Sequence, residues 1–168
     1  RIVMKLFLSL ISLSILVVSC GVYSFTGASI PTEAKTISVQ YISNKAAIVQ
    51  PSLSQAITDG LIDAFAGQTN LEITENEGDL SFSGYITKYQ IKPMAIKANE
   101  TASQNRLTIA IKIKYNNSFD DKQNFESTFS RYRDYASSEN IVDVEDGLIE
   151  EISKELIEDV FNKAFVNW

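Results

Sequence analysis

The side chains that could carry chemistry in this chain are few. Its 168 residues include no histidine and one cysteine, Cys20. The commonest general base and metal ligand are therefore missing, and no internal disulfide can form. Neighbouring carboxylates could serve as an acid–base pair, but on a helix they are more simply a solvated face. These pairs are Asp120–Asp121, Glu150–Glu151 and Glu158–Asp159. We predict a protein that is not an enzyme and has no metal or cofactor.

Cys20 ends a segment with the features of a secretory signal. Met4-Lys5 begins a short basic region, residues 6–18 are apolar apart from three serines, and Val17-Val18-Ser19-Cys20 resembles the bacterial lipobox. The apolar stretch is short for a membrane span, which needs about 20 such residues. The lipobox implies cleavage after residue 19 and a diacylglyceryl group on the Cys20 thiol; the alternative is an ordinary free or buried cysteine. We expect residues 1–19 to be a signal peptide and Cys20 to be a membrane anchor.

The remaining chain has the composition of one acidic folded domain. The hydrophobic fraction is 45% and the charged fraction 21%, both ordinary for a globular protein. Residues 1–19 contain two basic and no acidic residues, so removing them changes the net charge from −6 to −8. This charge argues against nucleic-acid binding, which requires a basic surface. We expect residues 20–34 to form a lipidated leader and residues 35–168 a single domain.

Hydrophobic periodicity predicts two helices and several strands in that domain. Alternating apolar residues predict strands at 35–42, 79–91, 106–115 and 125–135, with a shorter one at 71–74. Apolar residues at helical spacing predict one helix from Pro51 to about Gly67 and a long acidic helix from Ser138 onward. We therefore expect an α+β fold, a two-layer sandwich with both helices on one face of a mostly antiparallel sheet of about four strands.

Basic residues gather along the meander of predicted strands between residues 79 and 115 and on the strand that follows it. Several of them should share the polar face of the sheet, together with tyrosines, which are favoured at protein contacts. An ordinary solvated sheet face remains the simpler interpretation, and an anion contact site is the alternative. The basic residues are Lys88, Lys92, Lys97, Arg106, Lys112, Lys114, Arg131 and Arg133, and the tyrosines are Tyr85, Tyr89, Tyr132 and Tyr135.

Nearly the whole mature chain resembles the LptE family of lipopolysaccharide-assembly lipoproteins. The similarity lies in the order and length of its segments: "CGVYSFTGASI", "LSQAITDGLIDAF" with "QTNLEIT", the glycine-containing strand "GDLSFSGYITKYQIKPMAI", the hairpin "NRLTIAIKIKY" and "FESTFSRYRDY", and the closing helix "EEISKELIEDVFNKAFVNW". The resemblance implies an outer-membrane lipoprotein that plugs the LptD β-barrel and helps to assemble it, with its domain on the periplasmic side or inside the barrel.

The resemblance also suggests contact residues. Lys92, Lys97 and Arg106 are candidate contacts for lipopolysaccharide, and Tyr89, Arg106, Arg131 and Tyr132 are candidate contacts for the barrel. The competing hypothesis is a lipid-anchored binding module of another envelope assembly, such as a secretin or an adhesin machine.

Overall fold

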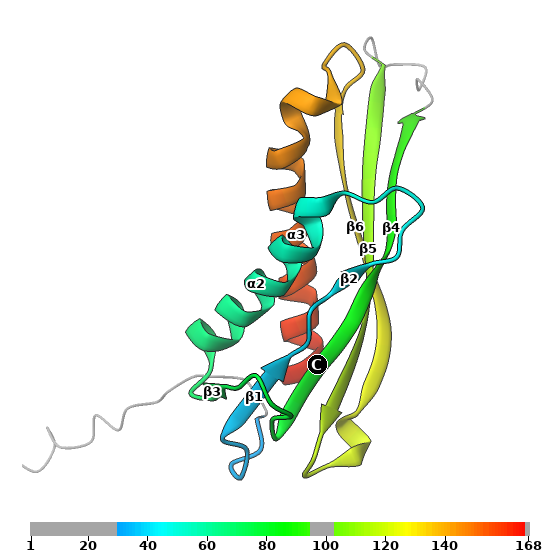
Figure 1. Ribbon diagram of the computed structural model, residues 1–168. Coiled ribbons are helices and arrows are strands. Elements are labelled where there is room, and N and C mark those ends of the chain that lie inside the picture. The colour runs from blue at the N-terminus through cyan, green and yellow to red at the C-terminus, as the bar shows by residue number, and fades with distance from the viewer. Residues whose placement is uncertain (1–29, 95–102, 167–168) are drawn as a thin grey trace, which may run out of the picture.

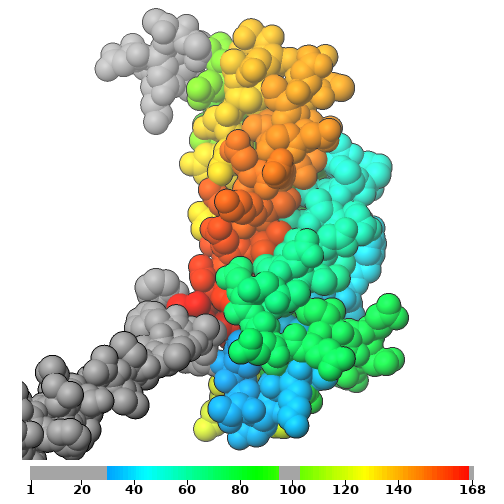
Figure 2. Space-filling view, turned by 90° about the vertical axis from the view of Figure 1, so that its left-hand side faces the viewer, coloured from blue at the N-terminus to red at the C-terminus, as the bar shows by residue number. Residues whose placement is uncertain are grey.

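The computed structural model describes residues 30–94 and 103–166, which form one sheet and a layer of two helices (Figure 1). Both helices lie on the same side of the sheet, and Figure 2 looks onto this helix side. The elements follow the order β1 (Thr36–Val39), β2 (Ser43–Asn44), α2 (Pro51–Gln68), β3 (Glu72–Ile73), β4 (Leu80–Met94), β5 (Gln104–Asn117), the short 3-10 helix η1 (Asp121–Gln123), β6 (Phe125–Ala136) and α3 (Ile141–Phe165). The expected α+β sandwich is confirmed.

The sheet differs from the prediction in size and direction. It has six strands in the order β3-β1-β4-β5-β6, with β2 also paired to β4. Only β4–β5 and β5–β6 are antiparallel, whereas β1 and β2 run parallel to β4, and β1 parallel to β3. The expectation of about four mostly antiparallel strands was therefore wrong. The reason is that α2 crosses over between β1–β2 and β3–β4, and such a crossover returns the chain in the same direction.

The predicted strand at 35–42 is shorter in the structure, because β1 ends at Val39 and the next short strand, β2, begins beyond the predicted range at Ser43. The backbone N–H of Ile42 donates to Oγ1 of Thr58 on α2, at 3.0 Å, and not to a neighbouring strand. Ile42 is fully buried and Tyr41 beside it is 59% exposed, although strict alternation along a strand would place Tyr41 on the buried face of Ile37. The chain rejoins the sheet at β2.

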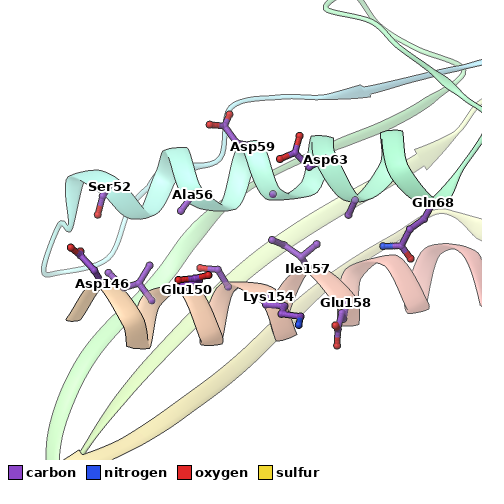
Figure 3. A pocket seen from close by; sticks show the side chains of 14 residues that line it. Ser52, Ala56, Asp59, Asp63, Gln68, Asp146, Glu150, Lys154, Ile157 and Glu158 are labelled. Atoms are coloured by element: carbon purple, nitrogen blue, oxygen red, sulfur yellow. The ribbon is translucent and has the colours of Figure 1, made fainter. Parts of the chain in front are cut away.

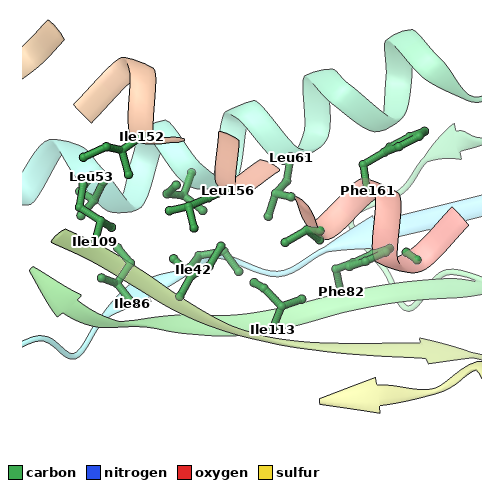
Figure 4. Close-up of a cluster of buried hydrophobic side chains, with 14 of the residues drawn as sticks. Ile42, Leu53, Leu61, Phe82, Ile86, Ile109, Ile113, Ile152, Leu156 and Phe161 are labelled. Carbon is green, nitrogen blue, oxygen red and sulfur yellow. The ribbon is translucent and has the colours of Figure 1, made fainter. Parts of the chain in front are cut away.

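The core lies between the sheet and the helices and follows the predicted apolar stripes (Figure 4). All five inward residues of β5 are at most 1% exposed, and both helices contribute fully buried side chains. At one end the aromatic rings of Phe65, Phe82, Tyr115 and Phe165 pack together, with centroids 4.5 Å apart for Phe65 and Phe82. The inward residues of β5 are Leu107, Ile109, Ile111, Ile113 and Tyr115.

Local signals fix the helix starts. Pro51 occupies the first turn of α2, where its missing N–H costs nothing. At the start of α3 the side chain of Asn140 accepts a hydrogen bond from the N–H of Val142, at 3.2 Å. Neither helix is long and apolar enough to cross a bilayer, within the described residues.

Candidate functional site

The sheet face away from the helices, which we call the open face, collects basic side chains from β4 and β5. Strand register places Lys92 beside Arg106, and Lys112 beside Tyr85. These positions alternate with the buried residues of β5, so they point away from the helices. The prediction that several basic residues share the polar face is confirmed. The basic residues on the strands of this face are Lys88, Lys92, Arg106, Lys112 and Lys114.

A β-bulge decides which side chains of β4 reach the open face. The pairing of β4 with β5 shifts between Ile86 and Lys88, which leaves Thr87 as the extra residue. The shift reverses the alternation, so Lys88 and Lys92 lie on the open face and Tyr89 lies toward the helices. Without the bulge Tyr89 would share the side of Tyr85, as the sequence pattern suggested.

Arg106, Tyr132 and Asp134 form an organised cluster on the open face. The Arg106 guanidinium donates from Nε and Nη2 to the two Asp134 carboxylate oxygens, at 2.7 and 2.8 Å. Its Cζ lies 3.6 Å from the centroid of the Tyr132 ring, and Tyr132 is itself 49% exposed. The hydrogen bond from Arg106 lowers the pKa of Asp134, and the same bond raises the pKa of Arg106. The cluster presents a rigid aromatic surface whose charge is largely balanced.

The positive charges of the other basic residues on the open face are less completely balanced by carboxylates. Lys112 forms an ion pair with Glu126 of β6, which raises the pKa of the lysine and lowers that of the glutamate. The Nζ atom of Lys45 lies 4.3 Å from the centroid of the Tyr85 ring. Within the described residues, Lys88, Lys92 and Lys114 form no ion pair. Excess positive charge therefore lies on this face of an otherwise acidic protein.

The structure places two predicted contact residues on the covered side of the sheet. Tyr89 is 5% exposed, and its hydroxyl donates to Glu145 of α3, which also accepts from Gln50 Nε2 at 2.7 Å. Burial raises the pKa of the Tyr89 hydroxyl, and the bond to Glu145 adds to the effect. Arg131 pairs in register with the buried Ile109. Tyr89 and Arg131, two of the candidate barrel contacts, therefore do not lie on the open face.

Arg131 and Arg133 instead tie the edge strand β6 to α3. Arg131 donates to both carboxylate oxygens of Asp159, at 2.6 and 2.7 Å, and Arg133 donates to Glu151 and Glu155, each at 2.6 Å. Neighbouring residues of a strand face opposite sides, so Arg131 and Tyr132 cannot both reach the open face. Inward-pointing charges of this kind also protect an edge strand from pairing with other chains.

Sequence reasoning missed the acidic members of the open face. Asp134 and Glu126 lie opposite Arg106 and Lys114 in the strand register, and Lys112 reaches Glu126 diagonally. The register of the β5–β6 hairpin, had it been worked out from the sequence, would have placed these two carboxylates beside the basic residues.

Two of the predicted site residues, Cys20 and Lys97, lie outside the described residues. No group of three or more side chains suited to a metal ion occurs in the part of the chain that is described.

Comparisons with solved structures agree on the fold. A minor lipoprotein from Acinetobacter baumannii matches with a TM-score of 0.51 at 12% identity, over 77% of this chain and 91% of its own. Lipoprotein B from Nitrosomonas europaea matches with a TM-score of 0.50 at 7% identity, over 76% and 80%. A Xanthomonas campestris protein matches with a TM-score of 0.52 at 12% identity, over 79% and 85%. At these identities the likeness concerns the fold alone.

Comparison with protein families identifies the family as well as the fold. No curated protein matches the chain. A family model described as "LptE: Lipopolysaccharide-assembly" matches residues 34–164, which include every helix and strand described above except the last residue of α3. The chain therefore belongs to the LptE lipopolysaccharide-assembly family.

Proposed function

We propose that this protein is a non-enzymatic outer-membrane lipoprotein that plugs the LptD β-barrel and assists its assembly in lipopolysaccharide transport. Family membership supports the transport role. The observation that supports this contact is the open face, where Arg106, Tyr132 and Asp134 form an organised surface that no helix or strand of the described residues covers. The interior of such a barrel is polar, so hydrogen-bonding and aromatic side chains suit its wall.

Lipopolysaccharide itself is a second proposed contact of the open face. Its phosphates require unpaired cations, and Lys92 meets this requirement better than Arg106, whose guanidinium is already held by Asp134. Lys97 stays a candidate from the sequence. A lipid-anchored module of a secretin or adhesin machine is the competing function.

The test of the barrel role is depletion combined with a matched pair of variants. Depletion should lower the amount of folded LptD and make cells sensitive to large hydrophobic antibiotics, measured by blot and by growth inhibition. Tyr132→Asp should fail to restore both, because it removes the exposed aromatic contact. Val142→Asp introduces the same charge at a 74% exposed position on α3 and should restore both. Normal folded barrel and unchanged sensitivity after depletion would sink the translocon role and favour the competing module.

We further propose that Cys20 is the lipidated first residue of the mature protein. The lipobox motivates this, and two or more acyl chains hold a protein stably at a membrane. Mass spectrometry of protein from native membranes should give an N-terminal peptide that begins at Cys20 and carries the mass of the lipid. Cys20→Ser should release a folded protein from the membrane fraction. An unmodified Cys20 thiol in the native protein would contradict the proposal.

A further inference from the structure

A groove runs along the outer side of the helix layer, between α2 and α3 (Figure 3). Its volume is about 680 Å³. The floor is built from small residues of α2 and from Ile149, Ser153 and Ile157 of α3. At Gly60 the helices are so close that an added Cβ would lie 2.4 Å from Cδ1 of Ile157. The small residues of the floor are Ala56, Gly60 and Ala64.

The rim of this groove is strongly acidic. Two carboxylates come from α2 and three from α3, and Lys154 is the one cation among the residues that line the groove. Their four-residue and eight-residue spacings place them in rows along each helix. None of these carboxylates forms an ion pair in the described structure, whereas Glu151, Glu155 and Asp159 of α3 are bound by arginines of β6. The carboxylates of the rim are Asp59, Asp63, Asp146, Glu150 and Glu158.

Ser153 gives an independent indication that the groove takes a ligand. Its side chain lines the groove and is 5% exposed, and its Oγ has no hydrogen-bond partner in the described structure. A buried hydroxyl without a partner costs free energy, and native proteins satisfy nearly all such groups. The Oγ itself has less than 1 Å² of exposed surface, so a bound group would supply the missing partner by entering between the helices with a small shift of the side chains beside Ser153.

The acidic rim and the length of the groove favour a ligand that carries several positive charges along an extended chain. A single metal ion is a poor fit, because no three carboxylates of the described residues come close enough together to hold one. An anionic lipid would be repelled by the rim. We propose that the groove binds a basic segment of a partner protein, with lysine or arginine side chains on the rim and small apolar side chains on the floor.

This contact is separate from the proposed barrel contact. The open face carries excess positive charge and lies on one side of the sheet, whereas the groove is negative and lies on the outer side of the helices (Figures 1 and 2). The protein can therefore hold an acidic or polar surface with its sheet and a basic segment with its helices. Failure of the groove proposal would leave the barrel role untouched, and the reverse also holds.

The test is binding of a blocked, fluorescent peptide of repeated Leu-Ala-Lys-Lys units to the full-length protein, followed by fluorescence anisotropy. Binding should weaken as salt is raised. A peptide with glutamate in place of lysine should not bind. The double variant Asp59→Asn/Asp63→Asn should weaken binding about tenfold. The control Glu75→Gln/Glu77→Gln removes the same charge at exposed residues outside the groove and should bind as the native protein does.

The variant Ser153→Ala tests whether the bound peptide contacts the Ser153 hydroxyl or is held only by electrostatic attraction to the acidic rim. It should weaken peptide binding about threefold without lowering the melting temperature, because it removes a polar group that has no partner in the free protein. Equal weakening by the two double variants would mean that only the overall charge matters and would overturn the proposal. Equal binding of the glutamate peptide, failure of the native protein to bind the lysine peptide, or tighter binding of anionic lipid vesicles would do the same.

Discussion

Ile111→Asp should unfold the domain. Ile111 is fully buried in the middle of β5, and its cross-strand neighbours are Ile86 and Phe129. The substitution removes a side chain whose loss alone costs about 2–5 kcal/mol. It also places a carboxylate among apolar neighbours, where ionisation is strongly unfavourable. Together these costs approach the total stability of an ordinary domain, about 5–15 kcal/mol.

A control on the same strand isolates the effect of burial. Thr108 lies on the open face between Gln90 and Tyr132 and is half-buried. Thr108→Asp introduces the same carboxylate beside basic residues and water, so it should lower the stability by about 1 kcal/mol or less. Far-UV circular dichroism and thermal unfolding of the purified proteins would compare the two. A cooperative transition for Ile111→Asp close to that of Thr108→Asp would contradict the position of the core.

The elements that the sequence predicted well are those whose apolar pattern is long and one-sided. The five alternating residues of β5 are all buried, as predicted. The stripes of α2 and α3 also meet the core, although Ala64, Val144 and Leu148 at their margins are only partly covered. Such patterns depend only on which face of an element leaves water, so they can be read without knowing its neighbours.

Features that depend on the neighbouring strand could not be predicted in this way. A second short parallel strand, β2, follows β1 beyond the predicted range, and between the two the N–H of Ile42 bonds Thr58 of α2 and not a neighbouring strand. The bulge at Thr87 is invisible in a pattern of alternating residues, yet it decides that Tyr89 bonds Glu145 while Lys92 faces outward. The candidate contact residues therefore fall into two groups: Arg106 and Tyr132 lie together on the open face, whereas Tyr89 and Arg131 bond acidic residues of α3.

The role of Gly84 also depends on the neighbouring strand, so it could not be predicted from the alternation of residues. Glycine weakens a strand interior, so its presence there requires a reason. The structure supplies one, because a Cβ at Gly84 would lie 2.1 Å from the backbone oxygen of Lys112 and 3.0 Å from Cδ1 of Ile113. The carbonyl belongs to β5 in the middle of the β4–β5 pairing. It cannot move aside as a flexible side chain could, so the two strands themselves would have to separate.

Gly84→Ala should therefore destabilise the protein by about 1–3 kcal/mol or more, the usual cost of an overpacked core. Gly147→Ala is the matched control, since Gly147 lies inside α3 with nothing within 4 Å of an added Cβ. There the same substitution should stabilise the protein by about 0.5–1 kcal/mol, because alanine restricts the unfolded chain and favours the helix. Urea unfolding should thus move in opposite directions for the two variants. If Gly84→Ala unfolds at the native midpoint, β4 and β5 do not approach each other as closely at Gly84 as the structure requires.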